Sequence, residues 1–420
     1  MNAPINLTGM TARALDRARV ELIAKAAEAR PGDVGAARRY LAAAIDLDDR
    51  DHGLRAARLY SCAAPGDAHG WHLLGDYCMQ RNLAADAVEA FTRACALDPG
   101  HSQFASAHGF ALRAVERQEE ADRTFARSLD LDPANPHAAR GWGQALLRRQ
   151  DWPGLKRHCE ELMPQIGVRS WLVAQYMIAG AMLGHRQTLS HLLDYDRFVE
   201  ESSLDLPPGF ASLEDFNEAL LSEMAAFEAP GEDGVAMDVV KEGRRLEGFP
   251  LAAVEVLGEA GAPAARALLE QAVRKLDAYA AALGDCLLAR MRPEQTRLSV
   301  DAILSDARTH LAPHTHACSW LNLVYYLKVP ETVRQDSRAG CMEFVPPLHK
   351  APVPKGIWPS RLVFPVAGKF VIFPGSYYHR VNATRQPGLR IALSFDIYPM
   401  PDCYLRGVSH ETWLDGIAQE

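Results

Sequence analysis

The segments AFTRACALDPGH (90–101) and TFARSLDLDPAN (124–135) align residue by residue at a spacing of 34. The alignment pairs Phe91 with Phe125, and the proline of each Asp-Pro pair also coincides. Self-similarity at a fixed period of this size indicates stacked supersecondary units. Small residues let two antiparallel helices approach closely, the phenylalanine fills the space between them, and the proline ends the second helix. The sequence therefore predicts repeated pairs of helices.

The residues around these segments resemble the tetratricopeptide repeat (TPR). One unit fills the template positions in order with Trp71, Leu74, Gly75, Ala87, Phe91, Ala94 and Pro99. The next unit keeps Gly109, Ala121, Phe125 and Pro133. Weaker units precede and follow these two, so the resemblance covers about residues 35–165. It implies a curved solenoid whose concave face holds a peptide or protein partner, and the alternative is a solenoid that only packs on the second half of the chain.

The composition of the chain changes after the helical half. WLVAQYMIAGAML (171–183) still has the pattern of a helix, whereas turn-forming and acidic residues gather within 201–235. We therefore expect a helical repeat domain at 1–200, a boundary segment at 201–235 and a second domain at 236–420. An amphipathic helix over 264–283 is predicted to lead into the second domain.

The second domain contains short runs of β-branched and aromatic residues that are separated by Pro and Gly turns. The runs are RLSVDAILS (297–305), WLNLVYYLKV (320–329), SRLVFPV (360–366), GKFVIFPG (368–375) and RIALSFDIY (390–398). Strands without intervening helices predict antiparallel sheets, closed or sandwiched. The expected fold is therefore an all-α solenoid followed by an antiparallel jelly roll, a double-stranded β-helix.

Three histidines stand at the edges of these predicted strands. His314 and His316 are two residues apart, so in an extended strand they point to the same side, together with Asn322 and Tyr326. His379 follows the FPG turn on a later strand. Two imidazoles on one strand and a third on another are able to converge on one metal ion at the mouth of a barrel.

The order of motifs in this half resembles the Fe(II)/2-oxoglutarate-dependent oxygenases, and most closely the putative 2OG-Fe(II) oxygenase branch, in which the motifs start with His-x-His. The motifs are HTH, VYYLKVPE, GxxxF, GxxxxFPGxxxH and RIxxSF, within about residues 295–398. The resemblance implies an enzyme that uses Fe(II), 2-oxoglutarate and O2 to hydroxylate a substrate. It also implies that His314 and His379 are the proximal and distal iron ligands and that Arg390 clamps the far carboxylate of the oxoacid.

The residues themselves support a carboxylate clamp at Arg390. On its strand, Ile391, Leu393 and Phe395 form an apolar side that must pack against another layer, which turns Arg390 and Ser394 inward. A buried guanidinium is costly without an anion, and its two parallel N–H groups match a carboxylate. We expect Ser394, Tyr326 and Asn322 to assist in binding the oxoacid.

The sequence departs from the usual pattern of the wider oxygenase superfamily at the second histidine. His316 stands where the usual His-x-Asp or His-x-Glu motif has its carboxylate. The metal is therefore held either by three imidazoles, with His316 as the third, or by a carboxylate from elsewhere, for which Glu343 is the nearest candidate. Two alternatives to the oxoacid-dependent hydroxylase stay open: a non-catalytic scaffold with a degenerate barrel, and a three-histidine iron dioxygenase that uses no oxoacid.

Composition excludes several other classes of protein. The 45 Lys and Arg residues against 53 Asp and Glu give a net charge of -8, which argues against nucleic acid and anionic membranes as partners. The longest apolar stretch, 171–183, is too short to span a bilayer, and residues 1–30 have no apolar signal segment. We therefore expect a cytoplasmic protein that binds neither nucleic acid nor membranes.

Overall fold

The computed structural model describes residues 9–400, apart from 48, 228–239, 242–243, 252, 255–257, 259–260, 332, 334–337, 348–351 and 386. The chain divides into two compact units, one formed mainly by residues 8–151 and the other mainly by 152–163 and 167–403. Each unit is considered by itself.

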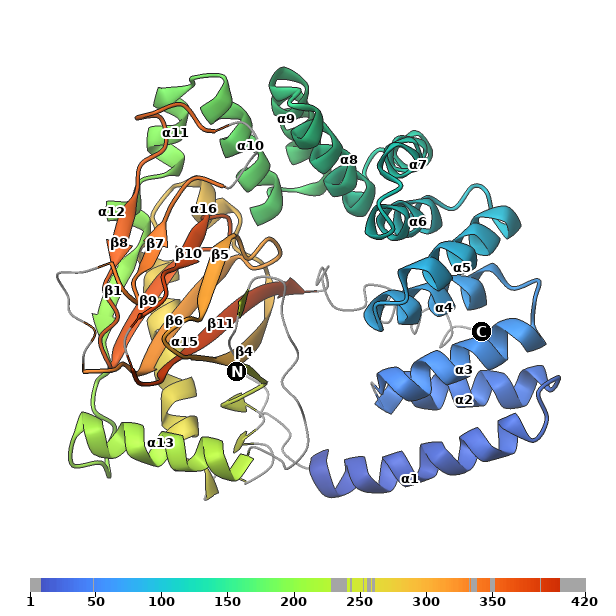
Figure 1. The fold of residues 1–420 in the computed structure, drawn as a ribbon, viewed down its shortest axis with the longest axis horizontal. Coiled ribbons are helices and arrows are strands. Elements are labelled where there is room, and N and C mark those ends of the chain that lie inside the picture. Colours follow the sequence, from blue (N-terminus) through green and yellow to red (C-terminus); the bar gives the residue numbers. More distant parts are fainter. Residues whose placement is uncertain are drawn as a thin grey trace. The chain divides into compact units, whose positions relative to one another are not determined.

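The first unit is built from helices that repeat every 34 residues (Figure 1). The helices of this unit are α1 (Gly9–Glu28), α2 (Val34–Leu47), α3 (Arg50–Ala63), α4 (Ala68–Gln80), α5 (Ala84–Leu97), α6 (Ser102–Ala114), α7 (Gln118–Leu131) and α8 (Pro136–Arg149). The first helices of successive pairs begin at 34, 68, 102 and 136, and the second helices begin at 50, 84 and 118. The predicted solenoid of TPR-like helix pairs is confirmed.

In two of the helix pairs, the helices pack closely at the position where the TPR template has a small residue opposite an aromatic ring. Gly75 on α4 lies against Phe91 on α5, and Gly109 on α6 lies in the same way against Phe125 on α7. Both phenylalanine side chains are almost fully buried. A Cβ atom added at Gly75 would come within 2.5 Å of Cε1 of Phe91. Glycine is therefore required here by the close approach of the two helices.

We expect Gly75→Val to destabilise the repeat unit by about 1–3 kcal/mol, the usual cost of overpacking a core. Helix propensity contributes little to this difference, because valine and glycine are both poor helix formers. Gly66→Val is the control, since a Cβ at Gly66 meets nothing within 4 Å. Urea unfolding of the full chain, followed by circular dichroism at about 222 nm, measures both variants. Equal stability of Gly75→Val and the parent would contradict this account of the packing.

The 34-residue spacing continues beyond the first unit. Helices α9 (Trp152–Ile166), α10 (Ser170–Met182) and α11 (Arg186–Leu192) begin 34 residues after α7, α8 and α9, respectively. Nearly all of these residues nevertheless belong to the second unit, together with the short helix α12 (Tyr195–Phe198). The two compact units thus divide near residue 151, within the segment 1–200 for which the sequence predicts one repeat domain.

The second unit contains two antiparallel sheets. Their strands are β1 (Glu200–Ser203), β2 (Val240–Lys241), β3 (Arg244–Glu247), β4 (Gln295–Ser305), β5 (His310–His314), β6 (Leu321–Lys328), β7 (Met342–Phe344), β8 (Arg361–Val363), β9 (Lys369–Pro374), β10 (His379–Val381) and β11 (Arg390–Met400). The strand orders are β1-β9-β6-β11-β4-β3 and β2-β5-β10-β7-β8. Counted from β4 as the first strand to β11 as the eighth, the central pairings are 6-3-8-1 and 2-7-4-5. This alternation between two sheets is the connectivity of a jelly roll, as predicted.

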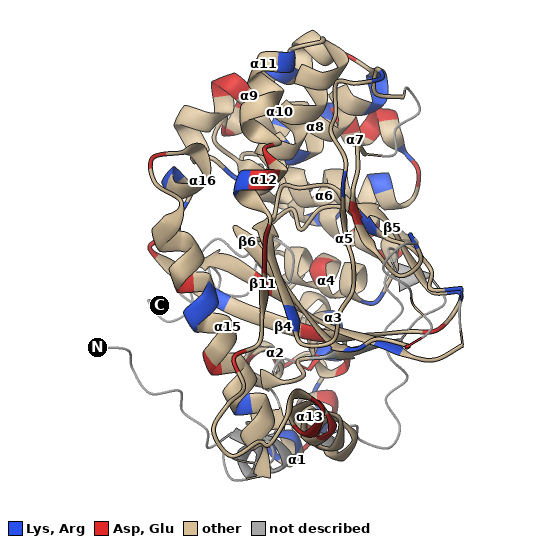
Figure 2. Cartoon of the chain, turned by 90° about the vertical axis from the view of Figure 1, so that its left-hand side faces the viewer, with Lys and Arg blue, Asp and Glu red and all other residues tan. Residues whose placement is uncertain are grey.

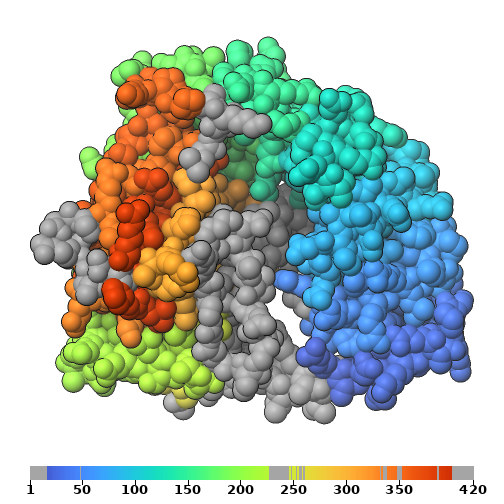
Figure 3. All heavy atoms as spheres, in the orientation of Figure 1, coloured from blue at the N-terminus to red at the C-terminus, as the bar shows by residue number. Residues whose placement is uncertain are grey.

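The segment predicted as a boundary, 201–235, is described over 201–227, and this part contributes to the second unit. Strand β1 pairs with β9 along its whole length, so an acidic, serine-rich tetrapeptide forms the edge of the larger sheet. Glu201 on β1 receives hydrogen bonds from Arg361 and Lys369, which explains why this short polar strand is stable at the edge. Helix α13 (Leu213–Phe227) follows, and its yellow-green residues lie against the orange strands in Figure 3.

Helices cover the outer face of the larger sheet. Helix α15 (Pro263–Ala282) coincides with the amphipathic helix predicted over 264–283, and it carries both acidic and basic residues (Figure 2). The Tyr325 hydroxyl on β6 donates to Oδ1 of Asn217 on α13 at 2.7 Å, and Nζ of Lys275 on α15 lies over the Phe370 ring. Because strand side chains alternate, Asn322, Val324 and Tyr326 lie on the inner face. The fully buried Leu393 and Phe395 on β11 likewise leave Arg390 facing inward.

A short helix, α16 (Leu287–Arg290), precedes β4. Within the described residues, none of the helices is both long and apolar enough to cross a membrane.

Candidate metal centre

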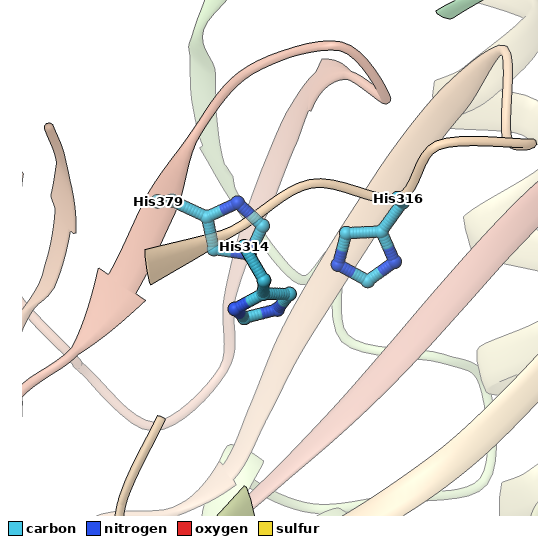
Figure 4. A group of neighbouring side chains, drawn as sticks. All are labelled: His314, His316 and His379. Carbon is cyan, nitrogen blue, oxygen red and sulfur yellow. The ribbon is translucent and has the colours of Figure 1, made fainter. Parts of the chain in front are cut away.

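Three histidine side chains converge between the two sheets (Figure 4). His314 ends β5 and His379 begins β10, and the two are direct cross-strand partners. His316 follows β5 in the loop that leads to β6. The ring centroids are 4.4 Å apart for His314 and His379, 5.2 Å for His316 and His379, and 5.3 Å for His314 and His316. One nitrogen from each ring lies within 4.8 Å of the other two, a spacing able to hold one metal ion.

The hydrogen bonds of the three rings select one tautomer. Nδ1 of His314 lies 2.8 Å from the carbonyl oxygen of Ala312, and Nδ1 of His379 lies 3.1 Å from that of Tyr377. Nδ1 of His316 lies 2.6 Å from Oδ1 of Asp396. Carbonyl and carboxylate oxygens accept hydrogen bonds, so Nδ1 carries the proton in all three rings. In a neutral ring that is protonated on Nδ1, Nε2 keeps its lone pair, as a metal ligand requires.

Burial keeps two of these rings neutral. Burial and the neighbouring His316 ring lower the pKa of His314 to about 4. Burial and both neighbouring histidines lower the pKa of His379 well below its usual value. These imidazoles are therefore uncharged near neutral pH, the form in which histidine binds metals.

Asp396 on β11 is a site residue that the sequence analysis did not identify. Its side chain is buried, and Oδ1 accepts hydrogen bonds from His316 Nδ1, from the Ser319 hydroxyl at 2.8 Å and from the Asn322 amide. Burial raises the pKa of Asp396, but the His316 ring and the hydrogen bonds from His316, Ser319 and Asn322 together hold this pKa below its usual value. The signal was present in the strand pattern, since Arg390, Ser394 and Asp396 share one face of β11.

The loop that carries His316 is held from two directions. The His316 backbone N–H donates to the carbonyl oxygen of Gly375 at 3.0 Å, and a Cβ on Gly375 would come within 2.0 Å of the Ser319 carbonyl oxygen. From the other direction, the start of α10 donates through Trp171 N–H to Ala317 at 2.9 Å and through the Ser170 hydroxyl to Ser319 at 2.5 Å. The glycine of the FPG motif is thus required by the close packing of this loop.

Arg390 is a buried cation without an anion. Its side chain is 2% exposed, and it forms no ion pair with any residue in the described part of the chain. Nη1 donates to the carbonyl oxygen of Gly340 at 2.8 Å, Nη2 lies 3.4 Å from the Ser305 hydroxyl, and Nε finds no acceptor among the described residues. Burial lowers the pKa of Arg390, which reflects the cost of an uncompensated charge. This guanidinium therefore has both a free donor and an unbalanced charge to offer to an anion.

Three further residues were expected to assist in binding the oxoacid. Tyr326 is buried and pairs with Ala392 across the strands, and the Arg390 charge opposes the rise in its pKa that burial causes. Ser394 lies half-buried on the same inner face. Asn322 differs from this expectation, because its amide nitrogen donates to Asp396 and Phe395, while its Oδ1 has no partner in the part of the chain that the structure describes. The Oδ1 atom of Asn322 can only accept a hydrogen bond, and a carboxylate has no hydrogen to donate to it.

Glu343, the alternative carboxylate, lies away from the three histidines. It neighbours Phe344, the cross-strand partner of His379, so Glu343 points to the opposite face of the smaller sheet. There its carboxylate accepts hydrogen bonds from Arg380 at 2.7 Å and from Arg338 at 3.1 Å. Pairing with two arginines accounts for its burial. The structure thus brings His316, and not Glu343, to the other two histidines.

One known protein family matches the part of the chain that contains this site. Residues 302–396 match the family described as "Putative 2OG-Fe(II) oxygenase". The match lies within the segment, about 295–398, for which the motifs predicted this resemblance. It includes all three histidines, Arg390 and Asp396. No curated protein matches the chain.

Several solved structures are similar to parts of the chain. A Pseudomonas putida prolyl-4-hydroxylase shares 16% identity, with a TM-score of 0.32, over 50% of this chain and 97% of its own. YrrB, a TPR protein with an unusual peptide-binding site, shares 14% identity, with a TM-score of 0.35, over 42% of this chain and 92% of its own. Pseudomonas aeruginosa pilF shares 17% identity, with a TM-score of 0.36, over 51% and 92%.

Proposed function

We propose that the second unit is an Fe(II)- and 2-oxoglutarate-dependent dioxygenase that hydroxylates its substrate. The observation that carries this proposal is the combination of three convergent imidazoles with Arg390, a buried cation in the same barrel interior that has no ion-pair partner among the described residues. The family match over residues 302–396 supports it.

The donor set suits iron. His314, His316 and His379 would hold the ion through Nε2, because their Nδ1 atoms already donate to oxygen. Imidazole is a suitable ligand for iron, and three protein ligands leave coordination positions for other groups. The bound iron supplies the O2-dependent oxidation that amino-acid side chains cannot perform.

The chain's own residues bind and orient the cosubstrate. Arg390 provides a planar fork that matches a carboxylate, and its Nε is free to donate. The neighbouring Tyr326 hydroxyl is a further candidate donor to the same carboxylate, and Ser394 lies along the same face. The buried aromatic rings of Phe373 and Phe344 lie 4.9 Å and 6.0 Å from the His379 ring, which excludes water from this side of the centre.

The repeat unit is the candidate for binding the substrate. TPR-like solenoids present an extended concave surface, and such surfaces bind peptides and proteins. We therefore propose that the substrate is a peptide or protein that the repeat unit recruits.

Metal and cosubstrate binding, measured on one preparation, test the proposal. The full chain, purified anaerobically, is titrated with Fe(II) and then with 2-oxoglutarate, and the formation of succinate is measured with and without the metal and with and without O2. We expect succinate that depends on both iron and O2. Iron binding without 2-oxoglutarate binding would favour the three-histidine dioxygenase, and binding of neither would favour the scaffold. Each of these outcomes contradicts the proposal.

A further inference from the structure

The three histidines differ in the group that accepts the hydrogen bond from Nδ1. His314 and His379 donate to backbone carbonyl oxygens, which are neutral. His316 donates to a carboxylate, Oδ1 of Asp396, at 2.6 Å. Three neutral imidazoles bring no negative charge to a divalent cation. Asp396 is therefore the negative charge that is hydrogen-bonded directly to one of the three rings.

The position of Asp396 is strongly determined. It lies in the middle of β11, where its cross-strand neighbours are Ser299 on β4 and Asn322 on β6. The Ser319 hydroxyl and the Asn322 amide donate to the same oxygen that His316 approaches. Ser319 and Asn322 are only three and six residues beyond His316, so the loop and strand that carry the histidine also carry the groups that orient its partner. Three donors on one oxygen leave the carboxylate little freedom to turn away.

We propose that Asp396 is a positioning residue that holds His316 as a metal ligand and supplies, through the imidazole, the negative charge that a ligand carboxylate would otherwise bring. This inference rests on the proposed metal-binding role of the three histidines. In the usual His-x-Asp or His-x-Glu motif of the wider oxygenase superfamily, the residue at the position of His316 is a carboxylate. In this chain the carboxylate lies one side chain further from the ion, behind the imidazole.

The physical effect follows from the hydrogen bond. A carboxylate that accepts from Nδ1 fixes the orientation of the ring and makes Nε2 a stronger donor to a cation. Loss of such a partner typically lowers metal affinity 10- to 100-fold. Because Asp396 touches the ligand and not the ion, its removal should weaken the centre without abolishing it.

Titration with Co(II) tests the inference without any activity measurement. Asp396→Asn keeps an acceptor oxygen of the same shape but removes the charge, and Asp396→Ala removes both. We expect affinity to fall about 10- to 100-fold for Asp396→Asn and further for Asp396→Ala, with a change in the visible absorption bands of the bound cobalt. Glu343→Gln is the matched control, because it neutralises another buried carboxylate of the same unit that faces away from the histidines.

A second measurement separates positioning from folding. Nitrogen NMR of 15N-histidine in the metal-free proteins reports the tautomer of each ring. We expect three rings protonated on Nδ1 in the parent, and a change confined to His316 in Asp396→Ala. Changes in all three rings would mean that Asp396 supports the fold and not one ligand. Parent-like cobalt affinity in Asp396→Asn would overturn the charge role alone, whereas a parent protein that binds no cobalt would overturn the proposed centre itself.

Discussion

Replacing His379 with Gln is expected to lower metal affinity by at least about 100-fold and to abolish succinate formation. Loss of a group that is only hydrogen-bonded to a metal ligand changes affinity by about 10- to 100-fold, and loss of one of three ligands should exceed that effect. His379 is 4% exposed and is the direct cross-strand partner of His314, so its ring is held at the centre of the three histidines' group by the strand register. Glutamine fills most of the space, which limits the cavity that a smaller residue would leave.

Calorimetric titration of the anaerobic protein with Fe(II) measures this loss. His310→Gln is the control, because His310 is an exposed histidine at the other end of the same strand, β5. We expect His310→Gln to bind iron as the parent does. Iron affinity of His379→Gln within a few-fold of the parent would show that the ion is held elsewhere.

Replacing Arg390 with Lys is expected to weaken 2-oxoglutarate binding roughly 10- to 150-fold, which corresponds to about 1.5–3 kcal/mol for a charge-assisted hydrogen bond. Lysine keeps the positive charge but lacks the planar fork, so it loses the bidentate contact with a carboxylate. Iron binding should be unchanged, because Arg390 is not hydrogen-bonded to any of the three histidines.

Titration of the iron-loaded protein with 2-oxoglutarate, in the absence of O2, measures this effect. Arg380→Lys is the matched control, since Arg380 lies on the opposite face of the smaller sheet and is paired with Glu343. We expect the control to bind 2-oxoglutarate normally. If Arg390→Lys also binds it as tightly as the parent, the clamp lies elsewhere, and the three-histidine dioxygenase that uses no oxoacid becomes the better description.

Local periodicity was sufficient to predict most of the architecture. The 34-residue spacing predicted the helix pairs because each repeat places the same small residue against the same ring, as at Gly75 and Phe91. The alternation along RIALSFDIY predicted the inward direction of Arg390, since Leu393 and Phe395 must be buried against another layer. The spacing of His314 and His316, with His379 after the FPG turn, predicted their convergence. The repeat period, the strand alternation and the shared side of His314 and His316 depend on residues close together in the sequence, whereas the approach of His379 to His314 joins two distant strands.

Tertiary structure alone decided which groups surround the histidines. His316 meets Asp396 across 80 residues of sequence, and this contact depends on the pairing of β11 with β6. Glu343 is directed away from the centre by the register of β7 against β10, which no local pattern reveals. The edge strand β1 depends on arginine and lysine partners more than 150 residues away, at Arg361 and Lys369. Repeat period and strand parity are local properties of the chain, whereas the hydrogen-bond partner of a buried polar group is set by whichever strand the fold places beside it.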